Sequence, residues 1–234
     1  MSIRKKILAI SIGPVLVLGV ITLLFMLTMV KSSLMDEVQD ALKGTAAATL
    51  AAYDQNTGDY LESTNGDIWK GSYNISKSEN LVDRIKENTG MDVTFFYGNK
   101  RIMTSALDKK GNRILGSEAG ERVVNQVIKG KKPFFSTNVS LDGTRNYGYF
   151  IPVYQNGTTD QVIGMVFVGT NKAQKDAIVN KILGSIMMAL LVVMLLCIVT
   201  AMRMAASISK NIKNSVAVVG KLADGDLNVW VDEK

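Results

Sequence analysis

A β-hairpin is predicted at residues 92–106, which read DVTFFYGNKRIMTSA. Apolar and polar residues alternate on both sides of the turn at 98–99, so the hairpin should bury one face and expose the other. Arg101 begins the second strand and Thr104 follows on the same strand. An arginine in this place either covers the edge of a sheet or contacts a molecule that enters from outside.

Helical spacing precedes this hairpin, and strand spacing follows it. Apolar residues recur every three or four positions in 34–52 and again in 78–88, as on one face of a helix. From residue 91 onward the period falls to two. We expect strands at 93–97, 101–106, 134–140, 146–153 and 161–170, with a further helix at 118–129. Helices followed by mostly antiparallel strands predict an α+β domain with segregated layers.

Two apolar runs enclose this domain. Residues 7–30 and 182–202 contain no charged side chain. At about 1.5 Å per residue, even the shorter run spans ~31 Å, which is enough to cross a hydrocarbon core of ~30 Å. A cleaved signal peptide is the alternative for the first run, but the apolar regions of signal peptides are only ~7–15 residues long. We therefore expect two transmembrane helices.

Basic residues at the ends of these runs indicate the orientation. They occupy positions 4–6 before the first run and positions 203, 210 and 213 after the second. By the positive-inside rule both termini are cytoplasmic and the domain between the runs lies outside the cell membrane. The predicted plan is a cytoplasmic N-terminus (1–6), a transmembrane helix (7–30), an extracytoplasmic domain (31–181), a second transmembrane helix (182–202) and a cytoplasmic segment (203–234).

The composition argues against several classes of protein. The net charge is +6, but residues 31–181 carry 19 basic and 17 acidic side chains, so the domain shows no electrostatic sign of nucleic-acid binding. Histidine is absent, and the single cysteine, Cys197, lies in the second apolar run. Disulfides, thiolate or imidazole metal sites and Ser–His catalysis are thereby excluded. The acidic residues are scattered, so we expect no enzyme, metal site or cofactor.

The cytoplasmic segment begins with a helical stripe. Apolar residues recur at three- and four-residue steps, at Ile208, Ile212, Val216, Val219 and Leu222, before DGDL (224–227) ends the pattern. So narrow a stripe, without a core of its own, is typical of a coiled-coil seam that needs a partner. A homodimer is the expected arrangement.

The domain resembles a known family in three segments. They read GMDVTFFYGNKRIMTSALDKKGNRILGSEA (90–119), VVNQVIKG (123–130) and YGYFIPVYQNGTTDQVIGMVFVGTN (147–171). Similar segments occur in the extracytoplasmic single Cache domains of bacterial chemoreceptors and sensor kinases. The resemblance implies a PAS-like antiparallel sheet with a long N-terminal helix. LADGDL (222–227) resembles the middle of a HAMP domain, although Asn211 stands where HAMP first helices commonly have a proline.

The order of these parts resembles the input half of a methyl-accepting chemotaxis protein. The resemblance implies a chemotaxis receptor in which the Cache domain binds a small solute and signals through the second transmembrane helix to HAMP and to cytoplasmic partners. The input half of a sensor histidine kinase or cyclase is an alternative, as is a module that docks a periplasmic binding protein. A fragment of a longer receptor is one interpretation of the chain, and the ligand and the output module stay open at this point.

Candidate ligand contacts follow from the same resemblance. In several carboxylate-sensing relatives an arginine matching Arg101 contacts the ligand, and a guanidinium can hold a carboxylate through two parallel hydrogen bonds. Thr104 would add a hydroxyl and Phe96 an apolar wall. Tyr147 and Tyr149 lie on the expected neighbouring strand, where alternation places Phe150 on the opposite face. We choose the tyrosines for the pocket because their hydroxyls need polar partners.

Trp69 and Tyr73 complete the predicted site as a lid. Each candidate also has a structural interpretation: a surface arginine, a strand-forming threonine and core aromatic residues. Some dicarboxylate-binding relatives carry basic residues four and two positions before the strand proline, where this chain has Gly148 and Phe150. This difference favours a monocarboxylate or a small heterocycle as the ligand.

Overall fold

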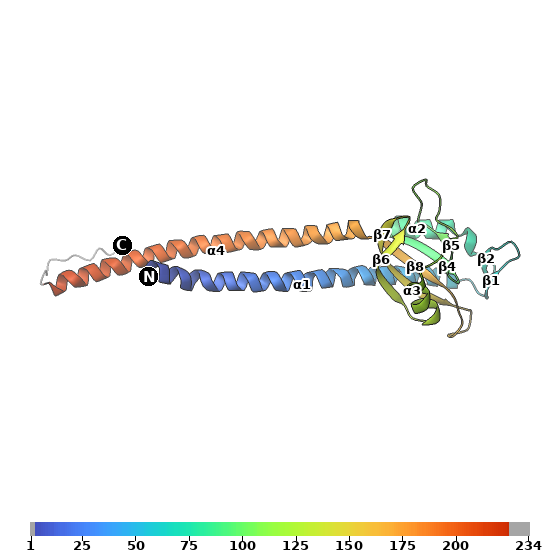
Figure 1. Cartoon of the computed structure of the whole chain (residues 1–234), viewed down its shortest axis with the longest axis horizontal. Coiled ribbons are helices and arrows are strands. Elements are labelled where there is room, and N and C mark those ends of the chain that lie inside the picture. The colour runs from blue at the N-terminus through green and yellow to red at the C-terminus, as the bar shows by residue number, and fades with distance from the viewer. Residues whose placement is uncertain (1–2, 225–234) are drawn as a thin grey trace. The chain divides into compact units, whose positions relative to one another are not determined.

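The computed structural model describes residues 3–224 of the chain (Figure 1). Its contacts divide the chain into two units, of which Ser32–Asn180 is one, and the segments on either side of it form the other. Elements occur in the order α1 (Ile3–Asp54), β1 (Tyr60–Glu62), β2 (Ile68–Lys70), β3 (Tyr73–Asn74), a 3₁₀ turn (Ile75–Lys77), α2 (Glu79–Thr89), β4 (Asp92–Tyr97), β5 (Lys100–Thr104), α3 (Glu121–Val123), the π-helix η2 (Val124–Lys129), β6 (Phe134–Leu141), β7 (Thr144–Tyr154), β8 (Val162–Asn171) and α4 (Lys172–Ala223).

The main sheet has five antiparallel strands in the order β5-β4-β8-β7-β6. The predicted hairpin is β4 and β5, with Gly98 at a φ of 56° in its turn. All five predicted strands are present within a few residues of their predicted limits. The prediction of an α+β domain with a long N-terminal helix and an antiparallel sheet is confirmed.

One face of this sheet packs against α1 and α2. Leu42, Ala46 and Tyr53, spaced as one helical face, are fully buried, and so is Val82 of α2. They share a core with alternate residues of β4, β7 and β8, because successive side chains of a strand point to opposite faces. Helix α2 ends as glycine-capped helices do, with Gly90 in the left-handed conformation. The expected uninterrupted helix through residues 34–52 is confirmed.

The opposite face packs against η2 and the segment before α3. Phe96, Phe150, Met165 and Phe167 are buried there, with Val127 of η2. The prediction that Phe150 and the two tyrosines of β7 face opposite sides is therefore confirmed.

Two local predictions were incomplete. Residues 53–90 contain a small sheet, β1-β2-β3, that the turn-rich sequence concealed because its strands are only two or three residues long. The helix expected at 118–129 begins at Glu121 and becomes a π-helix from Val124, and Gly130 follows it. Single π-turns often occur at functional sites, and Val123, directly before this one, lines the cavity described below.

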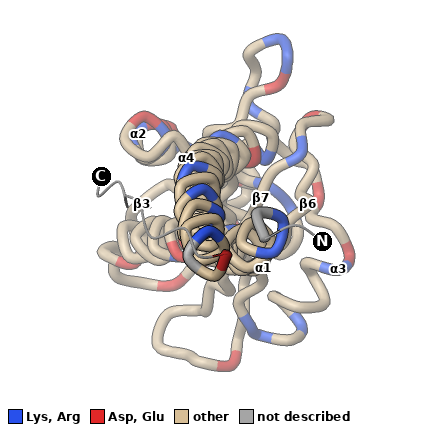
Figure 2. Tube along the Cα trace, turned by 90° about the vertical axis from the view of Figure 1, so that its left-hand side faces the viewer, with Lys and Arg blue, Asp and Glu red and all other residues tan. Residues whose placement is uncertain are grey.

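Both α1 and α4 include a stretch that is long and apolar enough to cross a membrane. Within these stretches, large apolar side chains such as Phe25 and Leu196 are more than 60% exposed. Such exposure is expected of a helix whose solvent is lipid. Two such helices beside the domain fit a two-span membrane protein. Figure 2 shows basic residues near the N-terminus of α1 and on the C-terminal part of α4, which are the residues from which the orientation was predicted.

The C-terminal stripe lies on α4. Ile208, Ile212, Val216 and Val219 are each at least 37% exposed, and α4 ends at Ala223, close to the predicted end of the helical pattern. The side chain of Leu222 and the HAMP-like residues 225–234 lie outside the described part of the chain.

Three buried tyrosines predict a loss of stability in alkali. Burial raises the pKa of Tyr53 and Tyr60, and burial with the hydrogen bond to Asp176 raises that of Tyr147 to about 12. Because each folded-state pKa exceeds the ordinary value of ~10, the unfolded chain loses these protons first. Stability should be complete below about pH 10 and fall as the pH rises towards 12. Denaturant unfolding of the full chain in detergent at pH 9 and 11.5 measures this.

Tyr147→Phe is the matched variant, since it removes only the ionisable hydroxyl. The fall in stability between the two pH values should be smaller for the variant than for the wild type. Equal losses in both proteins would contradict this assignment.

Candidate functional site

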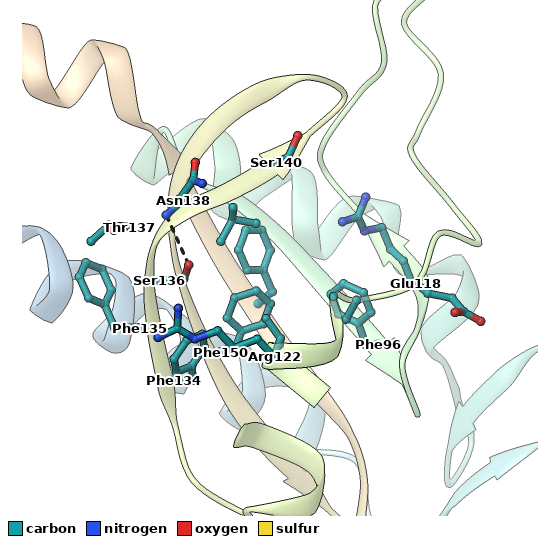
Figure 3. Close-up of a pocket in the computed structure, with 16 residues that line it drawn as sticks. Phe96, Glu118, Arg122, Phe134, Phe135, Ser136, Thr137, Asn138, Ser140 and Phe150 are labelled. Atoms are coloured by element: carbon teal, nitrogen blue, oxygen red, sulfur yellow. Dashed lines mark hydrogen bonds between the residues drawn. The ribbon is translucent and has the colours of Figure 1, made fainter. Parts of the chain in front are cut away.

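A cavity of about 490 Å³ opens on the sheet face that α1 does not cover (Figure 3). It lies between the sheet, the start of α3 and strand β6. It is lined by Phe96, Arg101, Glu118, Ala119, Gly120, Arg122, Val123, residues 134–140, Phe150 and Phe167.

Phenyl rings form the floor of this cavity. Phe150 of β7 and Phe167 of β8 are paired across the sheet, and their ring centroids are 4.7 Å apart. Phe96 of β4 belongs to the same buried cluster. All three are at most 3% exposed. Strand alternation thus places three aromatic side chains on the sheet face that lines the cavity.

Arg101 lies at the edge of this floor, where it places a positive charge in a buried position. Only 8% of the residue is exposed, and its guanidinium lies over the ring of Phe96, 5.3 Å from the ring centroid. Its Nε has no hydrogen-bond partner, and Nη1 donates only a long bond of 3.4 Å to the carbonyl of Ile114. Within residues 3–224 no carboxylate lies in ion-pair range of it.

Burial accordingly lowers the pKa of the Arg101 guanidinium from its usual value. An arginine nonetheless stays protonated in proteins, so a positive charge is held here without a counter-ion. A buried charge without a partner is costly. The negative charge of Asp92 opposes this lowering of the Arg101 pKa only in part, and Asp92 itself pairs with Lys86 at 2.8 Å. An anion that entered the cavity would supply the missing partner.

Two further charged residues line the cavity and are more exposed than Arg101. Arg122 of α3 lies over the ring of Phe134 at 5.3 Å, and Glu118 precedes the helix (Figure 3). Neither residue was among the predicted ligand contacts. No periodic pattern marks them, since they flank a three-residue helix whose position only the tertiary structure determines.

Strand β6 forms a polar wall. Its pairing with β7 shifts register between Ser136 and Val139, and the Asn138 N–H donates to the hydroxyl of Ser136 at 3.3 Å. Bulges of this kind redirect side chains, often next to functional sites. The irregularity brings Ser136, Thr137 and Asn138 together on the cavity.

Of the seven predicted contacts, the cavity brings together Arg101 and Phe96. Thr104 is fully buried, and its hydroxyl shares a 2.6 Å hydrogen bond with the hydroxyl of Thr94. Thr104 does not line the cavity. Trp69 lies on β2 and Tyr73 on β3, where Tyr73 packs 6.2 Å from the ring of Tyr53. Neither forms a lid over this cavity.

The prediction that Tyr147 and Tyr149, and not Phe150, line the ligand pocket does not hold for this cavity. Tyr147 and Tyr149 belong to the core on the α1 side of the sheet, whereas Phe150 lines the cavity. The polar partner that Tyr147 needs is within the protein, because its hydroxyl donates to Asp176 of α4 at 2.5 Å. Their role as ligand contacts was a prediction that this geometry does not support.

The described residues contain no group of three or more His, Cys, Asp or Glu side chains that could hold a metal ion. The chemistry available in the cavity is therefore that of guanidinium groups, hydroxyls, one carboxylate and phenyl rings.

The domain is thus an α+β fold, with a helical layer on one face of an antiparallel sheet and a cavity on the other. Residues 73–182 match the family model described as Single cache domain 3. This match agrees with the resemblance to single Cache domains that the sequence shows. No curated protein sequence matches the chain.

Solved structures offer more distant similarities. An extracellular ligand binding receptor from Desulfohalobium retbaense is 14% identical at a TM-score of 0.45, over 63% of this chain and 25% of the receptor. The sensor domain of DcuS from E. coli is 12% identical at a TM-score of 0.37, over 65% of this chain and 98% of that domain. The chain thus spans about a quarter of the length of the Desulfohalobium receptor.

Proposed function

We propose that the chain is the input half of a bacterial transmembrane chemoreceptor, whose Cache domain binds a small anionic solute outside the cell. The observation that carries this proposal is the buried guanidinium of Arg101, which has no counter-ion among the residues that the structure describes and borders a cavity of about 490 Å³. A pocket with apolar walls and a few converging polar groups is the usual form of a small-molecule site. The domain acts by binding and not by catalysis.

Contacts between the cavity wall and the start of α4 support a route for the signal. Lys172, the first residue of α4, donates to the carbonyl of Thr137 at 3.1 Å, and Thr137 lines the cavity. The Lys172 ammonium also lies 5.1 Å from the ring centroid of Tyr147, whose hydroxyl binds Asp176 one turn further along α4. A ligand that moves β6 therefore acts directly on the helix that leads to the membrane.

The remaining parts of the proposal follow the order of segments in the sequence. The Cache domain is extracytoplasmic, both termini are cytoplasmic, and two chains form a homodimer. The exposed stripe on α4 packs against its copy as the first helix of a HAMP domain, which continues towards cytoplasmic signalling partners. Ligand shifts the receptor only by its different affinity for two arrangements of the dimer, and the motion of α4 is small, on the order of 1–2 Å.

The test uses the full chain in nanodiscs, with Cys197 replaced by serine and single cysteines placed along 182–202. Acetate, succinate, benzoate and cyclohexanecarboxylate are added one at a time. At ~100 times its dissociation constant, a bound acid should add ~2.7 kcal/mol to the unfolding free energy, and the same acid should change the pattern of disulfide crosslinks between the two copies. If no acid changes stability or crosslinking, the domain is not a sensor of small carboxylates.

Lys172→Met is the matched variant for the signalling route. It removes the hydrogen bond to Thr137 and the charge over Tyr147, but leaves the cavity lining intact. The stabilisation by ligand should persist while the change in crosslinking is reduced. An unaltered crosslinking response would show that the signal does not pass through this contact.

A further inference from the structure

Two paired glycines shape the floor of the cavity. Gly148 of β7 lies directly opposite Gly169 of β8, next to the pair of Phe150 and Phe167 on the same face. A methyl group at Gly148 would lie 2.5 Å from a ring carbon of Phe167 and 2.8 Å from a methyl group of Val139. A methyl group at Gly169 would also collide with the ring of Phe167. The phenyl ring thus lies against the bare backbone of two strands.

This arrangement gives the cavity a flat apolar floor, and it leaves no charged side chain at position 148 of β7. Glycine is required wherever another group approaches the backbone so closely. The ring of Phe167 covers the position from which a longer side chain at Gly148 would reach into the cavity. Phe150 occupies the next position of β7 on this face. The floor therefore presents phenyl carbons and no cation to a ligand.

Positive charge is consequently confined to the edge of the floor. Arg101 is buried, and no carboxylate of the described residues lies in ion-pair range of it. Arg122 is exposed, and the carboxylate of Glu118 lies among the same lining residues. The buried charge of the site thus calls for a single anionic group, placed at Arg101, with the remainder of the ligand lying over phenyl rings.

We infer that the ligand is an aromatic monocarboxylate, with its carboxylate on Arg101 and its ring on the floor formed by Phe96, Phe150 and Phe167. This inference rests on the proposed function and names the class of solute. Aromatic rings associate in offset or edge-to-face geometries, which a phenyl floor offers and which a saturated ring cannot reproduce. A cavity of ~150 Å³ is sufficient for benzene, so about 490 Å³ accommodates an acid with one or two rings.

Calorimetric titration of the full chain in nanodiscs tests the inference. Benzoate should bind roughly 2- to 13-fold more tightly than cyclohexanecarboxylate, which carries the same charge on a saturated ring. It should bind roughly 10- to 150-fold more tightly than acetate, which has no apolar body to bury. Succinate, with a second charge, should bind more weakly than benzoate.

Gly148→Ala provides the variant, because its methyl group must push the ring of Phe167 out of place. The preference for benzoate over acetate should shrink at least several-fold. Gly44→Ala on α1 is the matched control, since a methyl group there meets nothing within 4 Å and should leave all affinities unchanged. Should Gly148→Ala fail to fold, the ligand series on the wild type decides the matter.

The outcomes separate this inference from the proposal on which it rests. If acetate, succinate or cyclohexanecarboxylate binds as tightly as benzoate, the aromatic assignment is wrong while the sensor function stands. If none of the four acids binds, both are wrong. A benzoate preference that survives Gly148→Ala unchanged would also overturn the role of the floor.

Discussion

Replacing Arg101 with methionine is expected to remove anion binding without destabilising the unliganded domain. The affinity for the acid that binds the wild type most tightly should fall roughly 10- to 150-fold, because a hydrogen bond to a charged group contributes about 1.5–3 kcal/mol. The free domain should be as stable as the wild type or more stable, since methionine replaces a buried charge that has no partner. Calorimetry gives the affinity, and denaturant unfolding gives the stability.

Arg113→Met is the matched control for this experiment. Arg113 donates to both carboxylate oxygens of Asp83, at 2.9 and 2.5 Å, and to the carbonyl of Thr104 at 2.7 Å. This arginine lies outside the cavity lining. Its loss should therefore lower stability and leave ligand affinity unchanged. The opposite result, in which Arg101→Met destabilises the free domain and preserves binding, would identify Arg101 as a structural residue.

Truncating Phe95 to alanine is expected to be the most damaging single change to the domain. The side chain is fully buried, with its ring centroid 5.2 Å from that of Tyr53 and 5.8 Å from that of Tyr60. It thus joins the end of α1 and the small sheet to β4. Phe→Ala changes in such positions cost about 3–5 kcal/mol, a large share of a typical stability of 5–15 kcal/mol.

Denaturant unfolding of the full chain in detergent, followed by circular dichroism, measures this loss. Leu61→Ala serves as the control, because Leu61 is 61% exposed on β1 and such surface changes usually stay within about 0.5 kcal/mol. A loss below about 1 kcal/mol for Phe95→Ala would mean that the aromatic cluster does not hold the domain together.

Much of the fold follows from periodicity alone. The change from three- and four-residue spacing to a period of two after residue 90 separates the helical layer from the sheet, and the structure has that order. Strand alternation also separates Phe150 from Tyr147 and Tyr149, as the two cores confirm. These features are local, because each depends only on which side a residue faces within its own element.

The candidate site was less accessible to the same reasoning. Arg101 and Phe96 were identified through family resemblance, and both lie on the cavity. Arg122 and Glu118 were missed because they flank a helix of one turn, which has no recognisable period. Gly148 was understood only as the loss of a basic residue, whereas its structural role is to let the ring of Phe167 lie against the sheet.

By itself, the sequence determined the order of the long helices and of the five strands of the main sheet, the two membrane-crossing candidates and the sets of residues that share a face. The tertiary structure decided which face of the main sheet lines a cavity. Tyr147 donates its hydroxyl to Asp176 of α4, which lies 29 residues further along the chain. The sheet face that carries Tyr147 is therefore part of the buried core. Arg101 has no carboxylate partner among residues 3–224, and the face that it shares with Phe96 keeps a cavity. Periodicity records which way a side chain points, but its partner depends on contacts between residues that are distant in sequence.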